Sequence, residues 1–87
     1  MSLARGQVVC SLAGRDKGSF LVVVSAGEKT LFLCDGKARP VERPKQKNRR
    51  HVAKTNRRLA EEQMKTNKQI RRALRDLCSA GQTKGGD

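Results

Sequence analysis

Residues 6–24 read GQVVCSLAGRDKGSFLVVV, and this stretch decides the fold. Two short apolar runs, 7–12 and 20–25, flank a connection that contains Gly14 and Gly18. Short runs rich in β-branched residues are typical of strands. Glycines supply the positive-φ positions that a tight connection requires. The stretch therefore predicts two antiparallel strands joined by a short, well-defined loop.

A third apolar run, 30–35, extends this pattern after the turn residues 26–29. The segment 39–56 contains both prolines of the chain and little that is apolar. It is therefore expected to be mostly loop, with one or two short edge strands around Val41 and Val52. The fold class is predicted to be mainly β, a small barrel of about five short antiparallel strands followed by a C-terminal α-helix.

The helix is predicted from residues that recur at helical spacing near the C-terminus. Thr66 and Gln69 have the spacing of a capping box, and Gly81 is a natural stop, so the helix is expected over 67–79. Its apolar residues form one stripe: Ile70, Ala73, Leu74, Leu77 and Cys78. The stripe is expected to pack on the barrel, and the alternative is that it binds a protein partner.

A chain of 87 residues is expected to form one domain with a small core. We predict a barrel over 1–58 that includes a basic segment at 37–58. A linker turn and the packed amphipathic helix are expected over 59–80, and a disordered tail over 81–87.

The charge is strongly positive and unevenly spread. Lys and Arg number 20 against 8 Asp and Glu, for a net charge of +12. Residues 1–36 contribute only +1, whereas the basic segment 37–58 contributes +9 from ten cationic side chains and one acidic one. This distribution predicts a surface that binds a polyanion, and the alternative is a merely solvated face.

The loop and its flanking strands resemble a KOW motif, the strand-loop-strand unit of many ribosomal proteins and transcription elongation factors. Elongation-factor motifs usually have a further glycine where this chain has Leu21. The order of segments is more similar to archaeal and eukaryotic-type large-subunit ribosomal proteins. The likeness covers residues 5–77, including LCDG at 33–36, NRRHVAKT at 48–55 and IRRAL at 70–74. It implies an SH3-like barrel and association with RNA or the ribosome.

The expected partner is structured RNA, namely rRNA of the large ribosomal subunit, bound by a protein that is monomeric off the ribosome. Gly14 and Gly18 are expected to shape the loop. The residues expected to contact RNA lie in the loop or the basic segment: Arg15, Lys17, Lys37, Arg39, Arg43, Lys45, Lys47, Asn48, Arg49, Arg50, His51, Lys54, Arg57 and Arg58. With Phe20 and Phe32 as the only aromatic residues, both expected in the core, phosphate and sugar contacts are expected to dominate over stacking.

The sequence contains no pattern for catalysis, a metal or a cofactor, so an enzyme with a small-molecule substrate is not expected. The three cysteines, Cys10, Cys34 and Cys78, lack metal-ligand spacing and are expected to be reduced and to serve only packing. With no signal-peptide or membrane-span pattern, a cytoplasmic protein is expected. The leading hypothesis is a translation-linked RNA-binding protein. The alternative is an elongation-type KOW module that contacts RNA polymerase.

Overall fold

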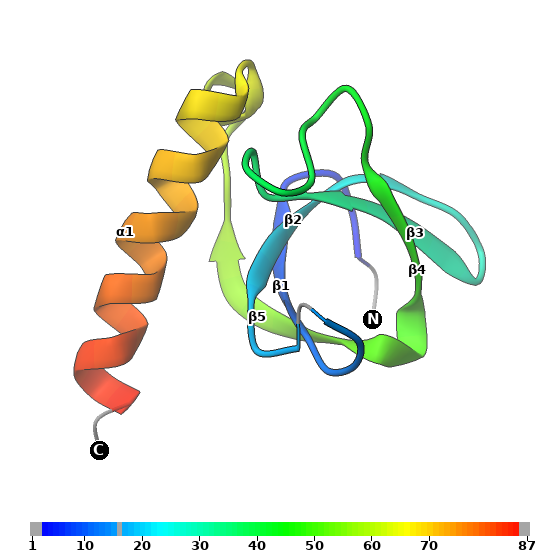
Figure 1. Ribbon diagram of the computed structural model, residues 1–87, viewed down its shortest axis with the longest axis horizontal. Coiled ribbons are helices and arrows are strands. Elements are labelled where there is room, and N and C mark those ends of the chain that lie inside the picture. The colour runs from blue at the N-terminus through cyan, green and yellow to red at the C-terminus, as the bar shows by residue number, and fades with distance from the viewer. Residues whose placement is uncertain (1–2, 16, 86–87) are drawn as a thin grey trace.

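The computed structural model describes residues 3–15 and 17–85, and the side chains among them up to Asp76. Five antiparallel strands form one sheet in the order β4-β3-β2-β1-β5. The sheet curls into a barrel, and the short 3-10 helix η1 connects its two edge strands, β4 and β5 (Figure 1). A second 3-10 helix, η2, leads to the C-terminal helix α1. The bounds are β1 Gln7–Ser11, β2 Phe20–Ala26, β3 Thr30–Cys34, β4 Lys45–Asn48, η1 Arg49–His51, β5 Val52–Arg58, η2 Glu61–Met64 and α1 Asn67–Gly85.

This architecture confirms the predicted fold class, a small mainly β barrel with a C-terminal helix. β1, β2 and β3 match the predicted runs to within one residue at each end. The reason is that residues on both faces of these strands pack into apolar clusters, so that most positions are apolar.

The two faces carry separate apolar clusters. Alternate strand residues pack on the inner side of the curled sheet: Val9, Leu21, Val23, Leu31, Leu33 and Val52. The residues between them pack outward against the helix: Val8, Val22 and Cys34 meet Leu59, Met64, Ile70, Ala73 and Leu74. The registers agree with this division, because Val8 lies opposite Val22, and Val22 lies opposite Cys34. The helix therefore completes a second core instead of standing apart from the barrel.

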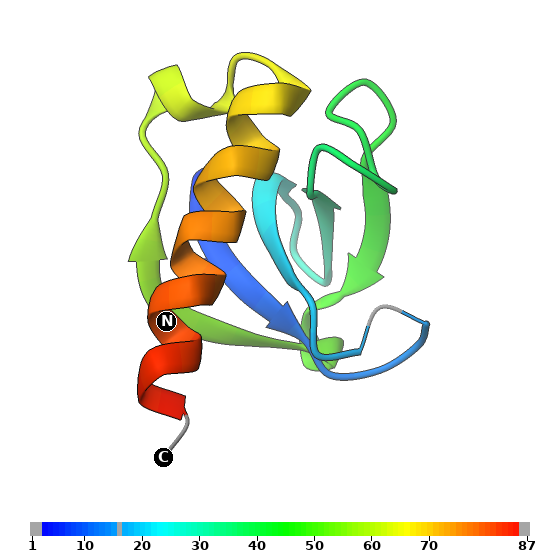
Figure 2. The same ribbon diagram turned by 60° about the vertical axis from the view of Figure 1, so that its left-hand side comes forward.

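Helix α1 lies over the outer face of β2 (Figure 2). Its start agrees with the prediction, because the Gln69 backbone N–H donates to Thr66 Oγ1 at 3.2 Å. Its end differs, since the helix runs to Gly85 and passes Gly81. A single glycine costs a helix only about 1 kcal/mol, and each added residue still gains a hydrogen bond. The helix thus covers 81–85 of the predicted tail, and residues 86–87 lie outside the described residues.

The edge strands were predicted less well. β4 reads KQKN and contains no apolar residue, so the expectation of strands around Val41 and Val52 is right for β5 but wrong for Val41, which lies in a turn. β4 forms because β3 offers it a backbone partner, with Leu31 opposite Lys47. The expected core position of the two phenylalanines is also corrected. Phe20 is half-buried against the helix-side cluster, and Phe32 is half-buried and belongs to neither cluster.

Candidate nucleic-acid interface

The β1–β2 loop, residues 12–19, has the shape that its glycines predict. Gly14 and Gly18 adopt φ values of +85° and +89°, in the left-handed region that favours glycine. Two backbone hydrogen bonds close the base of the loop: Gly18 N–H donates to the Ser11 carbonyl at 2.8 Å, and Ser11 N–H donates to the Ser19 carbonyl at 2.9 Å. Arg15 and Lys17 are exposed on this loop. Asp16 lies outside the described residues.

A buried lysine supports the loop from beneath. Lys47, on β4, is only 8% exposed, and its Nζ donates to the Ala13 carbonyl at 2.9 Å. The same carbonyl accepts from Ser11 Oγ at 3.0 Å. Lys47 was predicted to contact RNA, but its ammonium is directed into the protein, where it fixes the backbone of the loop. The sequence did not distinguish it, because its neighbours in the basic segment have the same residue types.

The loop is also bonded to η1, which carries several of the predicted residues. The Leu12 N–H donates to the His51 carbonyl at 2.8 Å. Asn48 caps η1, since its Oδ1 accepts from the Arg50 N–H at 2.8 Å. Arg50 and His51 are exposed. The loop and η1 therefore lie at the same end of the barrel (Figures 1 and 2).

We name this region the loop–η1 surface and define it by its exposed residues Arg15, Lys17, Arg50 and His51. Arg49 lies beside it with a different role. The Arg49 guanidinium donates to the Gly27 carbonyl through Nε at 3.2 Å and Nη2 at 3.0 Å, and thus ties η1 to the β2–β3 turn. Arg49 is half-buried as a result. Hydrogen bonds thus connect the β1–β2 loop, η1 and the β2–β3 turn. They make the loop–η1 surface rigid, and a binding surface requires such rigidity.

The remaining predicted residues lie in three other places. Lys54, Arg57 and Arg58 are exposed on the edge strand β5, and Lys45 is half-buried on β4. Another group lies in the β3–β4 connection: Lys37, Arg39 and Arg43. There Asp35 Oδ1 accepts from the backbone N–H groups of Lys37 and Arg39, both at 2.8 Å. The structure therefore distributes the predicted cations over one end of the barrel, both edges of the sheet and one long connection.

The β3–β4 connection is fastened to the start of helix α1. Asn67 Oδ1 accepts from the Val41 N–H at 2.6 Å, and Asn67 Nδ2 donates to Glu42 Oε1 at 2.9 Å. The hydrogen bond from Asn67 lowers the pKa of the Glu42 carboxyl. Arg71 Nη1 donates to the Gly36 carbonyl at 3.2 Å. These bonds fix the connection and the helix relative to each other.

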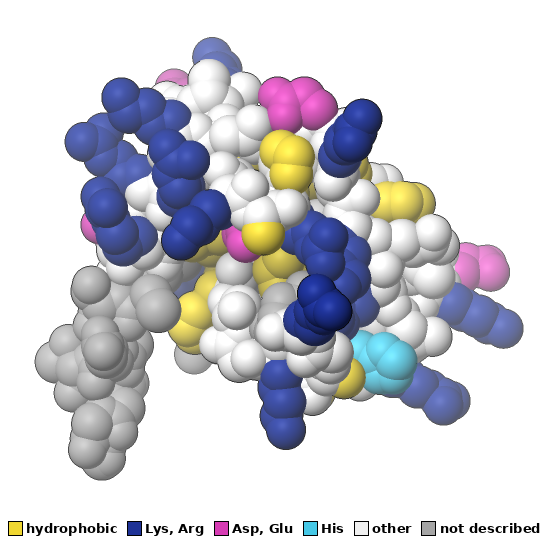
Figure 3. All heavy atoms as spheres, in the orientation of Figure 1, with side chains coloured by type: hydrophobic (Ala, Val, Ile, Leu, Met, Phe, Trp, Pro, Cys, Tyr) yellow, Lys and Arg dark blue, Asp and Glu magenta, His cyan; other side chains and the backbone are white. Residues whose placement is uncertain are grey.

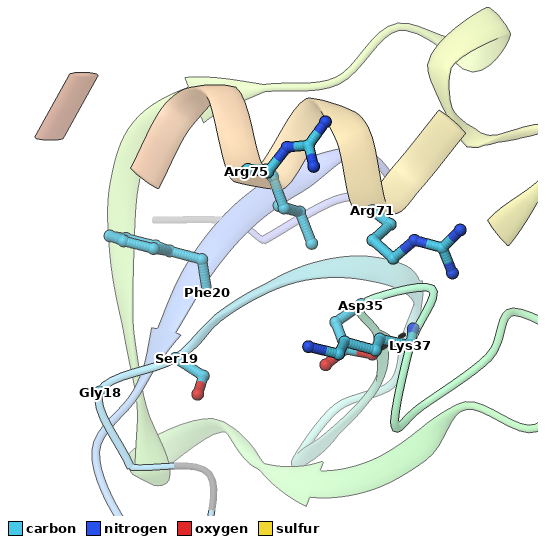
Figure 4. Close-up of a pocket in the computed structure, with 8 residues that line it drawn as sticks. Gly18, Ser19, Phe20, Asp35, Lys37, Arg71 and Arg75 are labelled. Carbon is cyan, nitrogen blue, oxygen red and sulfur yellow. Dashed lines mark hydrogen bonds between the residues drawn. The ribbon is translucent and has the colours of Figure 1, made fainter. Parts of the chain in front are cut away.

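A cleft of about 440 Å³ opens between the helix, this connection and the end of the β1–β2 loop (Figure 4). Arg71 and Arg75 line it from the helix, and Asp35 and Lys37 line it from the connection. Its full lining is Gly18, Ser19, Phe20, Asp35, Lys37, Arg71, Leu74 and Arg75.

A second hollow of about 220 Å³ is lined by four helix cations: Lys68, Arg71, Arg72 and Arg75. Figure 3 shows dark-blue side chains gathered over the described part of α1, with a second group toward the centre of the same face. Arg71 and Arg75 were not among the residues singled out for RNA contact, although the helix face that they share with Lys68 and Arg72 was expected to face solvent or RNA. The signal was present, because 68, 71, 72 and 75 have the spacing of one helix face.

Cysteine catalysis and metal binding have little support among the described residues. Cys34 is fully buried, and burial raises the pKa of its thiol from 9.0 to about 11, so it is not activated as a nucleophile. Cys10 is half-buried, and the side chain of Cys78 lies outside those described. Within the described part of the chain, His, Cys, Asp and Glu form no group of three that could hold a metal ion. No described helix is long and apolar enough to cross a membrane.

No protein-family model matches the chain, and no curated protein matches it in sequence.

Proposed function

We propose that this protein is a cytoplasmic KOW-type RNA-binding protein that acts in translation as a ribosomal or ribosome-associated component. The observation that carries the proposal is that hydrogen bonding holds the β1–β2 loop against η1. Their backbones are joined by the Leu12–His51 hydrogen bond, and both carry exposed cations. A rigid, cationic surface suits the phosphates of folded RNA.

The charge supports a binding mode dominated by phosphate. The net charge of +12 favours a polyanionic partner, and the cations at the loop–η1 surface and on β5 are exposed to solvent. The contact set differs from the one predicted from sequence, because Lys47 and Arg49 hold protein backbone. We assign the main phosphate contacts to Arg15, Lys17, Arg50, Lys54, Arg57 and Arg58, with His51 beside them.

The proposal predicts a steep dependence of affinity on salt. If about six phosphates are contacted, the logarithm of the association constant should fall with the logarithm of salt with a slope of about 4 to 5. Filter binding of the purified protein to fragments of large-subunit rRNA, at several salt concentrations, measures this slope. A slope near zero, or no binding to any fragment at low salt, contradicts the proposal.

Sedimentation of cell lysate in sucrose gradients tests the biological setting. We expect the protein to sediment with large ribosomal subunits at low salt and to leave them at high salt, because screening weakens phosphate contacts. Co-purification with RNA polymerase instead of ribosomes would favour the transcription-elongation alternative. That result would retain RNA binding but move it to another process.

A further inference from the structure

The cleft between α1 and the barrel is not used by the phosphate contacts assigned above. We propose that this cleft binds one unpaired nucleotide of the RNA, with the base against Phe20 and the adjoining phosphate at Arg71 and Arg75. This inference rests on the proposed function, since it assumes that the protein binds RNA. The inference adds a preference for RNA in which one nucleotide is unpaired and lies outside the RNA double helix.

The apolar part of the lining suits a base. Phe20 and Leu74 both line the cleft, and Phe20 is only half-buried, so part of its ring is accessible. A volume of about 440 Å³ falls within the range of about 300–1,000 Å³ that is usual for small-molecule sites. Unpaired bases are commonly recognised by stacking on aromatic side chains. One accessible phenylalanine is enough for one base, although it is too little for an extended single strand.

The polar part of the lining suits a phosphate. Lys37, Arg71 and Arg75 bring three positive charges, against the single carboxylate of Asp35. That carboxylate already accepts two backbone N–H groups through Oδ1, which orders the turn at Lys37. Arg71 is oriented by its bond to the Gly36 carbonyl. An anionic ligand is therefore favoured, and guanidinium groups are well matched to phosphate oxygens.

The second hollow extends the cationic lining beyond the cleft. It shares Arg71 and Arg75 with the cleft and adds Lys68 and Arg72. A nucleotide within a chain has a phosphate on each side, so a cationic path that leaves the cleft fits a chain better than a free mononucleotide. The opposite end of the cleft is formed by Gly18 and Ser19, which belong to the same loop as Arg15 and Lys17. The cleft is thus continuous with the loop that the proposed function uses.

Two RNA hairpins test the proposal, one fully paired and one identical except for a single-nucleotide bulge in the stem. We expect the parent protein to bind the bulged hairpin about tenfold more tightly, the gain typical of one stacked base. Phe20→Leu and Arg75→Glu should each remove most of this preference. Phe32→Leu changes the other half-buried phenylalanine and should retain it, as should Arg57→Glu on β5, which weakens binding to both hairpins alike. Circular dichroism melts of each variant establish that it is folded.

The outcomes separate this inference from the proposed function. Equal affinity of the parent protein for the two hairpins, with a steep salt dependence, overturns the cleft proposal and leaves RNA binding intact. An unchanged preference in folded Arg75→Glu also overturns it. Binding to neither hairpin, nor to the rRNA fragments, defeats both proposals. Displacement of the bulged hairpin by micromolar AMP would assign the cleft to a free nucleotide and so contradict the proposal as well.

Discussion

The central strands and the edge strands of the sheet differ in what surrounds them. β1, β2 and β3 contribute residues to both apolar clusters, the inner cluster on one side and the helix-side cluster on the other. β4 and β5 are the edges of the same sheet, and most of their side chains are polar and exposed. The centre and the edges of this one small sheet therefore have different roles. Its centre supplies the stability, and its edges are left free to carry cations.

Lys47 is the exception that connects the two regions. It belongs to an edge strand, yet it is buried, and its ammonium holds the loop between two central strands. A charge in such a place is costly unless it is bonded, and this one is bonded to backbone. The edge strand therefore contributes one residue to the shape of the loop, while Lys45, its other lysine, is half-buried.

The largest expected effect comes from placing a charge in the centre of the sheet. Leu33 on β3 is fully buried, so Leu33→Asp introduces an unpaired carboxylate that costs several kcal/mol, against a stability of about 5 kcal/mol for a domain of this size. We expect this variant to be unfolded at 25 °C by circular dichroism. Gln46→Asp places the same side chain at an exposed position of β4 and should melt within a few degrees of the parent protein. A cooperative melt for Leu33→Asp at the parental temperature would contradict the conclusion that the central strands supply the stability.

The central strands could be predicted because residues on both of their faces pack into apolar clusters, which makes most positions apolar, as in LVVV at 21–24. Thr66 and Ile70 likewise identify the start of the helix and the stripe that packs. β4 could not be predicted, since nothing in KQKN marks a strand and its place depends on pairing with β3. For the same reason, the basic segment did not reveal that Lys47 is buried. The cleft was also missed, because it exists only where the helix, two connections and β2 meet in space.

The next effect compares two glycines that both have positive φ but different surroundings. Gly36 adopts φ +76°, and a Cβ there would collide with the backbone carbonyl of Asn67 at the start of α1. Gly18 adopts φ +89° with no atom within 4 Å of such a Cβ. Gly18→Ala should therefore cost only the left-handed strain, about 1–2 kcal/mol.

Gly36→Ala adds a steric collision to that strain and should separate the helix from the β3–β4 connection. We expect its melting temperature to lie at least about 8 °C below that of Gly18→Ala, which corresponds to about 1–2 kcal/mol for a chain of this length. Thermal melts of the two variants measure this difference. Equal melting temperatures would show that the connection can move away from the helix at little cost.

A smaller effect is expected for the buried lysine. Lys47→Met keeps most of the side-chain volume but removes the bond to the Ala13 carbonyl, which should lower the free energy of unfolding by about 1 kcal/mol. RNA affinity should fall as well, because the loop loses a support. Lys54→Met is the matched control on the exposed edge and should reduce RNA affinity without changing the urea midpoint. An unchanged midpoint and an unchanged RNA affinity for Lys47→Met would show that Ser11 alone holds the carbonyl.

The smallest effect on stability per residue is expected from reversing exposed cations, and it is paired with the largest effect on binding. Lys17, Arg50 and Lys54 are exposed, so changing all three to Glu should alter stability by less than about 0.5 kcal/mol each. RNA binding should fall by more than about tenfold, because three phosphate contacts become repulsive. Filter binding and circular dichroism of the same preparation measure both quantities. A parental affinity at moderate salt would mean that the edge cations are merely solvated, and binding would then have to depend on the cations around the cleft.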